Sequence, residues 1–287
     1  MSDDAMPTVR DVAGLRAATA AWRGAGQRLG LVPTMGALHD GHLALVAAAR
    51  RVADRVVVSL FVNPKQFGPH EDFDRYPRRE AEDRQRLAAA GVDLLYAPGV
   101  AAIYPDGFTT SVAVEGALTQ GLEGVWRPGH FTGVATVVLK LLLQAEPRVA
   151  AFGEKDFQQL QVIRRMVRDL DVDTEILAVP TVRDGHGLAL SSRNQALDAA
   201  EIAIARRLNR ILADLVARLR AAPDDVEPAR AAAVAALLSA GFGSVDYVAV
   251  VRADGLEPVA RVAGACRVLA AARLGAVRLI DNLPLEA

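Results

Sequence analysis

Short apolar runs alternate with amphipathic stretches along the first two thirds of the chain, and this alternation restricts the fold more than any other feature. The run at 56–62, VVVSLFV, is almost continuously apolar, as is typical of a parallel strand covered on both faces. Further strands are predicted at 29–32, 92–96, 109–114, 149–152 and 174–179. The predicted helices cover 8–27, 41–52, 78–90, 130–144 and 156–170. This order predicts an α/β, Rossmann-like parallel sheet with helices on both faces.

A second, smaller α+β domain is predicted beyond 183–194, a stretch that resembles a hinge. Its predicted helices cover 198–220 and 228–240, and its predicted strands cover 245–251, 267–271 and 276–280. We place the boundary after residue 184, which divides the chain into an N-terminal domain, 1–184, and a C-terminal cap domain, 185–287.

Composition supports a large core and excludes several classes of protein. Of the 287 residues, 52% are hydrophobic, and the net charge of −1 gives no general attraction to nucleic acid or to an anionic membrane. The single Cys266 excludes an internal disulfide and a cysteine metal cluster, and its apolar surroundings predict a buried thiol. The first residues, MSDDAMPTVR, lack the long apolar core of a signal peptide or membrane anchor, so we expect a cytosolic protein.

The stretch LVPTMGALHDGH at 31–42 joins the first apolar strand to the next helix. Its two histidines, His39 and His42, fall on the first helical turn, where residues three apart are neighbours. Unpaired backbone N–H groups and the helix dipole favour an anion there, so we predict a nucleotide phosphate site. Two histidines without a third ligand are an incomplete zinc set. From spacing alone, solvent-facing histidines are an equal alternative.

Three other strings follow: FVNPKQF at 61–67, FGEKDFQQL at 152–160 and LALSSRN at 188–194. Asn63 before Pro64 suits a loop cap as well as a ligand contact, whereas the Gln66 amide can both donate to and accept from a hydroxy acid. Lys155 is notable because the chain has 30 arginines and only three lysines, and Asp156 beside it also suits a helix cap. In WRPGH, Arg127 and His130 suit an anion contact and a cap equally.

In this wording and order, the four strings resemble the pantothenate synthetase family of HIGH-type adenylyl-transferring enzymes. The resemblance runs from Leu31 to about Asn194 and resumes at 272–282, ARLGAVRLIDN. The family usually has Asp-Gly before LALSSRN, whereas this chain has His186-Gly187, with Asp184-Gly185 two residues earlier.

The resemblance implies an AMP-forming ligase that makes a carbon–nitrogen bond. ATP and pantoate would give pantoyl adenylate and pyrophosphate, and β-alanine would then give pantothenate, a precursor of coenzyme A, and AMP. The alternative is a HIGH-type nucleotidyltransferase that retains the nucleotide on its product. A dehydrogenase or P-loop enzyme is disfavoured, because neither G-x-G-x-x-G after the first strand nor G-x-x-x-x-G-K-[ST] occurs.

The same resemblance implies the site residues, with His42 as proton donor. The expected catalytic set is His39, His42, Lys155, Ser191, Ser192 and Arg193. The expected ATP-binding set is Pro33, Met35, Gly36, Ala37, Leu38, His39, Asp40, Gly41, His42, Gly153, Glu154, Lys155, Asp156, Val182, Leu190, Ser191, Ser192 and Arg193. Pantoate is expected at Gln66 and Gln159, and β-alanine at Gln66. We expect no protein metal site, with Mg²⁺ bound mainly through the ATP phosphates, a homodimer, and no nucleic-acid or membrane partner.

Overall fold

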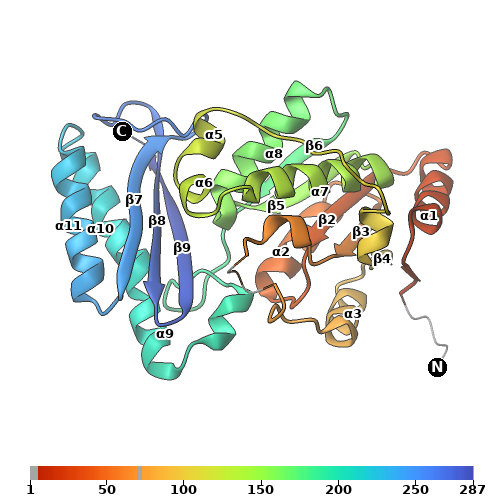
Figure 1. Ribbon diagram of the computed structural model, residues 1–287, viewed down its shortest axis with the longest axis horizontal. Helices are drawn as coiled ribbons and strands as arrows, with labels where there is room; N and C mark the ends of the chain where they lie inside the picture. The colour runs from red at the N-terminus through yellow and green to blue at the C-terminus, as the bar shows by residue number, and fades with distance from the viewer. Residues whose placement is uncertain (1–5, 70, 72, 287) are drawn as a thin grey trace. The chain divides into compact units, whose positions relative to one another are not determined.

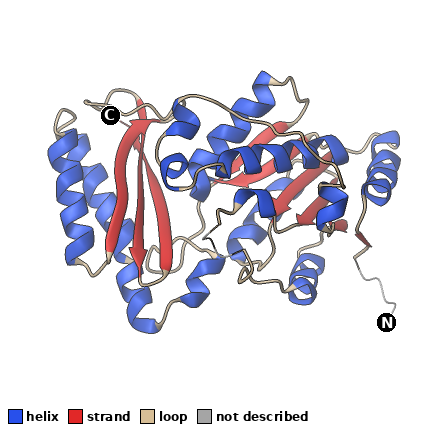
Figure 2. Cartoon of the chain, viewed as in Figure 1, coloured by secondary structure: helices blue, strands red, loops and turns tan. Residues whose placement is uncertain are grey.

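The computed structural model describes residues 6–69, 71 and 73–286. The chain forms two compact units. The first unit comprises residues 1–114, 127–154 and 162–180, and the second comprises 115–126, 155–161 and 181–287. Figure 1 labels the elements along the chain, and Figure 2 separates helices from strands.

The first unit is built on a six-stranded sheet in which every pairing is parallel. The strand order is β1-β4-β3-β2-β5-β6. The bounds are β1 Thr8–Val9, β2 Leu29–Thr34, β3 Arg55–Leu60, β4 Leu94–Tyr96, β5 Val149–Gly153 and β6 Glu175–Val179. The predicted α/β sheet is confirmed.

Helices cover the central strands because these strands are apolar on both faces. The helices of this part of the chain are α1 Val12–Gly24, α2 Asp40–Arg50, α3 Glu80–Ala89, α4 Val100–Ile103, α7 His130–Ala145 and α8 Phe157–Asp169, the last shared between the units. On one face, Val32 and Val58 pack with Val46 of α2 and Leu87 of α3. Because successive strand residues alternate between faces, Leu31 points to the other side, where α1 and α7 contact each other and β2.

The order of the strands fixes where a ligand can bind. β2 pairs with β3 on one side and with β5 on the other. The chain therefore first adds β3 beside β2, and later adds β5 along the opposite edge of β2. In parallel sheets of this kind, ligands usually bind at the carboxyl ends of the strands, at the point where the strand order reverses. Here that point lies at the ends of β2, at Thr34, and of β5, at Gly153.

Three predicted elements are wrong or incomplete. The segment 109–114 forms no strand; its Val112 N–H donates to the Thr136 hydroxyl of α7 at 2.9 Å, so a helix side chain takes the place of a strand partner. The predicted helix 8–27 begins only at Val12, because Thr8 and Val9 pair with β4 and Asp11 caps the helix. The predicted helix 198–220 is interrupted at Arg206.

The second unit has a three-stranded antiparallel sheet with two long helices on one face. Its elements are α5 Ala117–Gln120, α6 Glu123–Trp126, α9 Ala199–Ala205, α10 Arg207–Ala221, α11 Val226–Ser239, β7 Ser244–Arg252, β8 Ala265–Leu274 and β9 Val277–Glu286. Alternate residues of the strands pack with α10 and α11, and Cys266 is buried among them as predicted. The small α+β architecture is confirmed, and the boundary at residue 184 stays a prediction.

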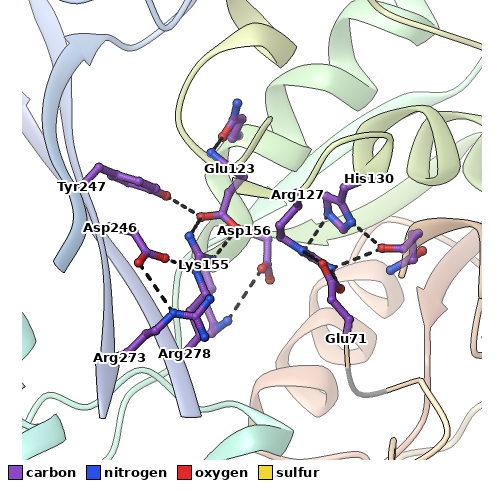
Figure 3. Close-up of polar contacts among 12 residues, drawn as sticks. Glu71, Glu123, Arg127, His130, Lys155, Asp156, Asp246, Tyr247, Arg273 and Arg278 are labelled. Carbon is purple, nitrogen blue, oxygen red and sulfur yellow. Dashed lines mark hydrogen bonds and ion pairs between the residues drawn. The ribbon is translucent and has the colours of Figure 1, made fainter. Parts of the chain in front are cut away.

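The opposite face of this small sheet carries several charged and polar side chains, which bind the segment 115–126. Arg278 of β9 donates to both carboxylate oxygens of Glu123, at 2.7 and 2.8 Å, and to Asp246 at 2.6 Å. Tyr247 donates to Glu123 at 2.7 Å, as Figure 3 shows. Burial, and then the Glu123 carboxylate, raises the pKa of Tyr247 well above its ordinary value. Burial opposes the charge of Arg278, but its bonds with Glu123 and Asp246 raise its pKa, so Arg278 stays charged.

No helix among the described residues is long and apolar enough to cross a membrane.

We predict that Arg278→Met destabilises the protein far more than the same change at an exposed arginine. The substitution removes the Arg278 cation from the buried Glu123 carboxylate and leaves Asp246 with Arg273, 3.7 Å away. Loss of one partner of a buried ion pair costs about 3–5 kcal/mol of the free energy of unfolding in comparable cases. Arg252→Met is the matched control, because Arg252 also lies in this sheet and its side chain is 58% exposed; we expect about 0–1 kcal/mol. Urea unfolding of both variants measures the difference, and equal losses would contradict the prediction.

Candidate functional site

The loop that follows β2 is held by a buried carboxylate from a different helix. Asp83 of α3 is 2% exposed, and its two oxygens accept the N–H groups of Ala37 and Leu38 at 2.9 and 2.8 Å. Gly36 and Ala37 both have positive φ, +85° and +51°, and the second is uncommon for a residue with a side chain. The contact therefore fixes an unusual backbone directly before α2.

His39 and His42 cap α2 with their own ring nitrogens. The His39 Nδ1 accepts the Gly41 N–H at 3.1 Å, and the His42 Nδ1 accepts the His39 N–H at 3.2 Å. The rings lie side by side, with centroids 4.1 Å apart, as the spacing predicts. Because each Nδ1 acts as an acceptor, each neutral imidazole carries its proton on Nε2.

These contacts correct the expectation that unpaired backbone donors bind the anion. The N–H groups of Gly36, Ala37, Leu38, His39, Gly41, His42 and Leu43 all donate within the chain, to Thr34, Asp83, His39 or His42. The sequence pattern suggested that the N–H groups at the start of α2 have no partner. In the structure, Asp83, which is distant in sequence, and the histidines themselves accept these N–H groups. These seven N–H groups therefore do not form an open backbone cradle of the P-loop kind.

The short helix η1, Pro64–Gln66, presents the Gln66 amide beside Met35. Asn63 is 1% exposed and fully engaged: its amide nitrogen donates to Gln66 Oε1 and Gly133 O, and its oxygen accepts from Lys65 N and from the Tyr104 hydroxyl. The structural alternative for Asn63 is therefore confirmed. Gln66 in turn donates from Nε2 to the sulfur of Met35 at 3.1 Å. The amide orientation is thus set, with the Nε2 donor on the Met35 side.

Residues at the start of α7 hold the Gln66 backbone. His130 donates from Nδ1 to the Gln66 carbonyl at 2.8 Å and accepts at Nε2 from Arg127, which also pairs with both oxygens of Glu71 (Figure 3). At Gly133, a Cβ atom would lie only 2.1 Å from the Lys65 carbonyl oxygen, so α7 and η1 can approach this closely only because that residue is glycine. Arg127 and His130 are thus positioning residues for Gln66, and neither is simply a helix cap.

The Tyr104 hydroxyl is a further donor that holds Asn63. The Tyr104 hydroxyl is buried, which raises the pKa of Tyr104 to about 12, so it remains protonated and donates to Asn63 at neutral pH.

Lys155 and Asp156 lie in the turn η2, Glu154–Asp156, directly after β5, with Lys155 Nζ 3.7 Å from the Asp156 carboxylate. Within the second unit, Asn282 of β9 donates to the Lys155 carbonyl at 2.9 Å, and Arg267 of β8 stacks on Phe157 at 4.2 Å. The polar face of the small sheet therefore fixes the backbone that carries Lys155.

Gln159 lies on α8, one residue after Gln158. Gln158 is 3% exposed and is used structurally, because its amide nitrogen donates to the carbonyls of Leu118 and Gly121. Its oxygen accepts the Glu123 N–H at 3.0 Å. These bonds tie the segment 115–126 to the start of α8 within the second unit.

The LALSSRN string follows a tight turn. Val182 accepts the Leu190 N–H at 2.9 Å, and the Asp184 carboxylate accepts the N–H groups of His186 and Leu188. Burial opposes its charge, but the Arg206 side chain and these backbone donors lower the pKa of Asp184. His186 contributes its backbone only, so Asp184 serves the turn although the usual Asp-Gly pair is missing.

Ser191 and Asn194 use part of their side chains to shape the chain that follows this turn. The Ser191 hydroxyl accepts the Arg193 N–H at 3.3 Å, and the Asn194 amide donates to the Ala189 carbonyl. Ser192 between them is 8% exposed.

The predicted site residues divide between the two units. The first unit carries Pro33, Met35, Gly36, Ala37, Leu38, His39, Asp40, Gly41, His42, Gln66, Gly153 and Glu154. The second carries Lys155, Asp156, Gln159, Val182, Leu190, Ser191, Ser192 and Arg193. β2 pairs with β5, so these two strands lie next to each other in the first sheet. The roles of the residues that follow them remain predictions.

Sequence reasoning missed Asp83. It lies four residues before the fully buried Leu87, on the same face of α3, and an acid in that position of a helix is a signal for a buried, hydrogen-bonded carboxylate.

Comparison with known proteins agrees with this arrangement. The family model described as pantoate-beta-alanine ligase matches residues 7–284. The pantothenate synthetase of Rhizorhabdus wittichii is 56% identical over 281 residues, covering 98% of this chain and 99% of that protein. That of Paramagnetospirillum magneticum is 55% identical over 284 residues, covering 98% and 99%.

Solved structures of the same name share the fold. The pantoate-beta-alanine ligase of Thermus thermophilus has a TM-score of 0.90 at 49% identity, covering 97% of this chain and 99% of that chain. The Francisella tularensis enzyme, complexed with beta-gamma ATP and beta-alanine, has a TM-score of 0.82 at 35% identity, covering 97% of each chain. With its paired histidines at the β2–α2 junction and these matches over nearly its whole length, the chain belongs to the pantoate–β-alanine ligase, or pantothenate synthetase, family.

Proposed function

We propose that this chain condenses pantoate with β-alanine in an ATP-dependent reaction that releases AMP and pyrophosphate. The observation that carries the proposal is the pair of imidazoles at the start of α2, each with its proton on Nε2, in a chain of this family. A donor held in that way can stabilise the charge that develops on a phosphate during adenylyl transfer.

The chemistry requires two displacements and no protein nucleophile. A pantoate carboxylate oxygen attacks the α-phosphorus of ATP, the bond to the bridging oxygen of the β-phosphate breaks, and pyrophosphate leaves. The β-alanine amine then attacks the acyl carbon, the bond to AMP breaks, and the amine nitrogen loses a proton as the amide forms. Orientation of the reactants carries much of such a reaction, for which effective molarities on the order of 10⁵ M or more are known.

We assign His42 to the first displacement and His39 to the same phosphate region. The fixed Nε2–H of His42 would donate to an α-phosphate oxygen as negative charge grows on it. Imidazole N–H donors suit phosphate oxygens and not a cation, so Mg²⁺ is assigned to the phosphates of ATP, where it would neutralise charge.

Gln66 is assigned to pantoate and β-alanine, and Gln159 to pantoate. The support for Gln66 is its orientation: Asn63 occupies the amide oxygen, and the Nε2 donor suits a carboxylate or hydroxyl oxygen of the acid.

The second unit supplies the remaining proposed ATP residues. Lys155 would balance phosphate charge, Asp156 would lie near the ribose, and Ser191, Ser192 and Arg193 would contact the triphosphate. We further propose the division into domains 1–184 and 185–287, a homodimer, and a cytosolic location where ATP is supplied.

Product analysis tests the proposal directly. With ATP, pantoate and β-alanine together, we expect AMP, pyrophosphate and pantothenate in equal amounts. Omission of β-alanine should leave pyrophosphate formation dependent on pantoate. ADP as the product would refute adenylyl transfer, and a product that keeps the nucleotide would favour the other class of HIGH-type nucleotidyltransferase.

We predict that His42→Ala lowers the rate of adenylate formation about 10²–10³-fold, the scale seen when one preorganised donor is removed, while ATP affinity falls much less. His42→Gln should recover more activity than His42→Asn, because only the longer amide reaches the position of Nε2. Single-turnover pyrophosphate release at saturating ATP and pantoate measures the rate. If His42→Ala binds ATP weakly but releases pyrophosphate at the normal rate once ATP and pantoate are saturating, His42 acts only on ground-state binding.

We predict that Gln66→Ala weakens pantoate binding far more than ATP binding. Loss of the amide leaves a buried polar group of the ligand unpaired, which costs roughly 1–3 kcal/mol. Gln85→Ala, at an exposed position on α3, is the control and should change neither affinity. Titration calorimetry with each substrate compares the two losses, and equal losses would refute the assignment.

A further inference from the structure

We propose that Asp83 is a positioning residue for the adenylation step, acting through the loop that carries the paired histidines. The inference rests on the proposed function, since it assigns a further residue to the same site. Asp83 itself contacts backbone only, so its effect would be transmitted to His39 and His42 and not exerted on the substrate.

The Asp83 carboxylate is unusually buried. Asp83 is 2% exposed, and both of its oxygens accept backbone N–H groups of a loop 45 and 46 residues earlier in the sequence. A buried carboxylate is costly unless it is well hydrogen-bonded, so its position and that of the loop determine each other. The negative charge also lies near the positive end of α2, where it is favourable.

The contact with Asp83 holds a strained backbone. Ala37 adopts φ of +51°, which costs free energy for a residue with a Cβ atom and persists only where the surroundings enforce it. Gly36 fits tightly against the carboxylate, because a Cβ atom there would lie 3.1 Å from Asp83 Oδ2. Asp83 therefore constrains the loop at two adjacent residues: it packs against Gly36 and accepts the N–H of Ala37.

The loop that Asp83 holds leads directly to the two imidazoles. Leu38, the second residue that Asp83 holds, directly precedes His39, whose N–H donates to His42 Nδ1. That bond fixes both the tautomer and the direction of the His42 ring. A shift of the loop would therefore move the Nε2 donor, and a misplacement of about 1 Å can cost about 10²-fold in rate.

The test compares the two half-reactions in Asp83→Asn. The amide keeps the shape of the side chain but turns one acceptor into a donor that faces a backbone N–H. We expect adenylate formation, measured as single-turnover pyrophosphate release, to fall about 10- to 100-fold. Transfer of the acyl group from supplied pantoyl adenylate to β-alanine should stay within about threefold, because no attack at the α-phosphorus is needed in this step.

Two further variants separate positioning from loss of folding. Glu82→Gln is the matched control on the neighbouring residue of α3, whose side chain is 67% exposed, and it should leave both half-reactions unchanged. Gly36→Ala disturbs the same contact from the loop side and should give the same selective loss. Both substitutions disturb the same contact between Asp83 and the loop. The rate of adenylate formation in the Asp83→Asn, Gly36→Ala double variant should therefore fall by less than the product of the two single-variant losses.

The outcomes are distinct. A proportional fall in both half-reactions, or no fall in either, would overturn the positioning role of Asp83. A wild-type protein that forms no adenylate from ATP and pantoate would overturn the proposed function, and this inference with it.

Discussion

The hydrogen bonding of the β2–α2 loop is the constraint on which the candidate site depends. A helix start normally leaves several N–H groups without partners, and many nucleotide-binding proteins use them for phosphate. Here Thr34, Asp83 and the two imidazoles accept those groups instead. These backbone groups therefore have partners within the chain. In the function that we propose, the donors to phosphate are the Nε2–H groups of His39 and His42, which the same bonds hold in one tautomer.

The acid-binding side of the site is built on the same principle. Gln66 is the side chain proposed to contact the acid, yet most of its position is set by groups that need no substrate: Asn63 at its amide, His130 at its carbonyl, and the absence of a side chain at Gly133. In the β2–α2 loop and around Gln66, buried polar groups find hydrogen-bond partners within the protein. The same bonds orient a donor: the imidazole Nε2–H in the loop and the amide Nε2 of Gln66.

The second unit uses its sheet for two purposes. Apolar side chains on one face pack against α10 and α11, while the other face bears charged and amide groups that bind backbone and side chains of 115–126 and of the start of α8. The Glu123–Arg278 pair is buried, and the bond from Asn282 holds the carbonyl of Lys155. Segments that are far apart in the chain, and that the sequence suggested belonged to the first domain, are thus joined to the C-terminal strands.

The sequence by itself determined the alternation of strands and helices, the parallel sheet, the small α+β unit and the family, because apolar periodicity and local motifs such as LVPTMGALHDGH are local properties. The proximity of His39 and His42 was likewise determined by their spacing. Only the tertiary structure decided that 109–114 pairs with a helix side chain and not a strand, that Asn63 is structural, and that Asp83 closes the helix start. Each of these depends on a partner at least 20 residues away in sequence. A buried polar group selects such a partner by hydrogen-bond geometry, which exists only once the chain has folded.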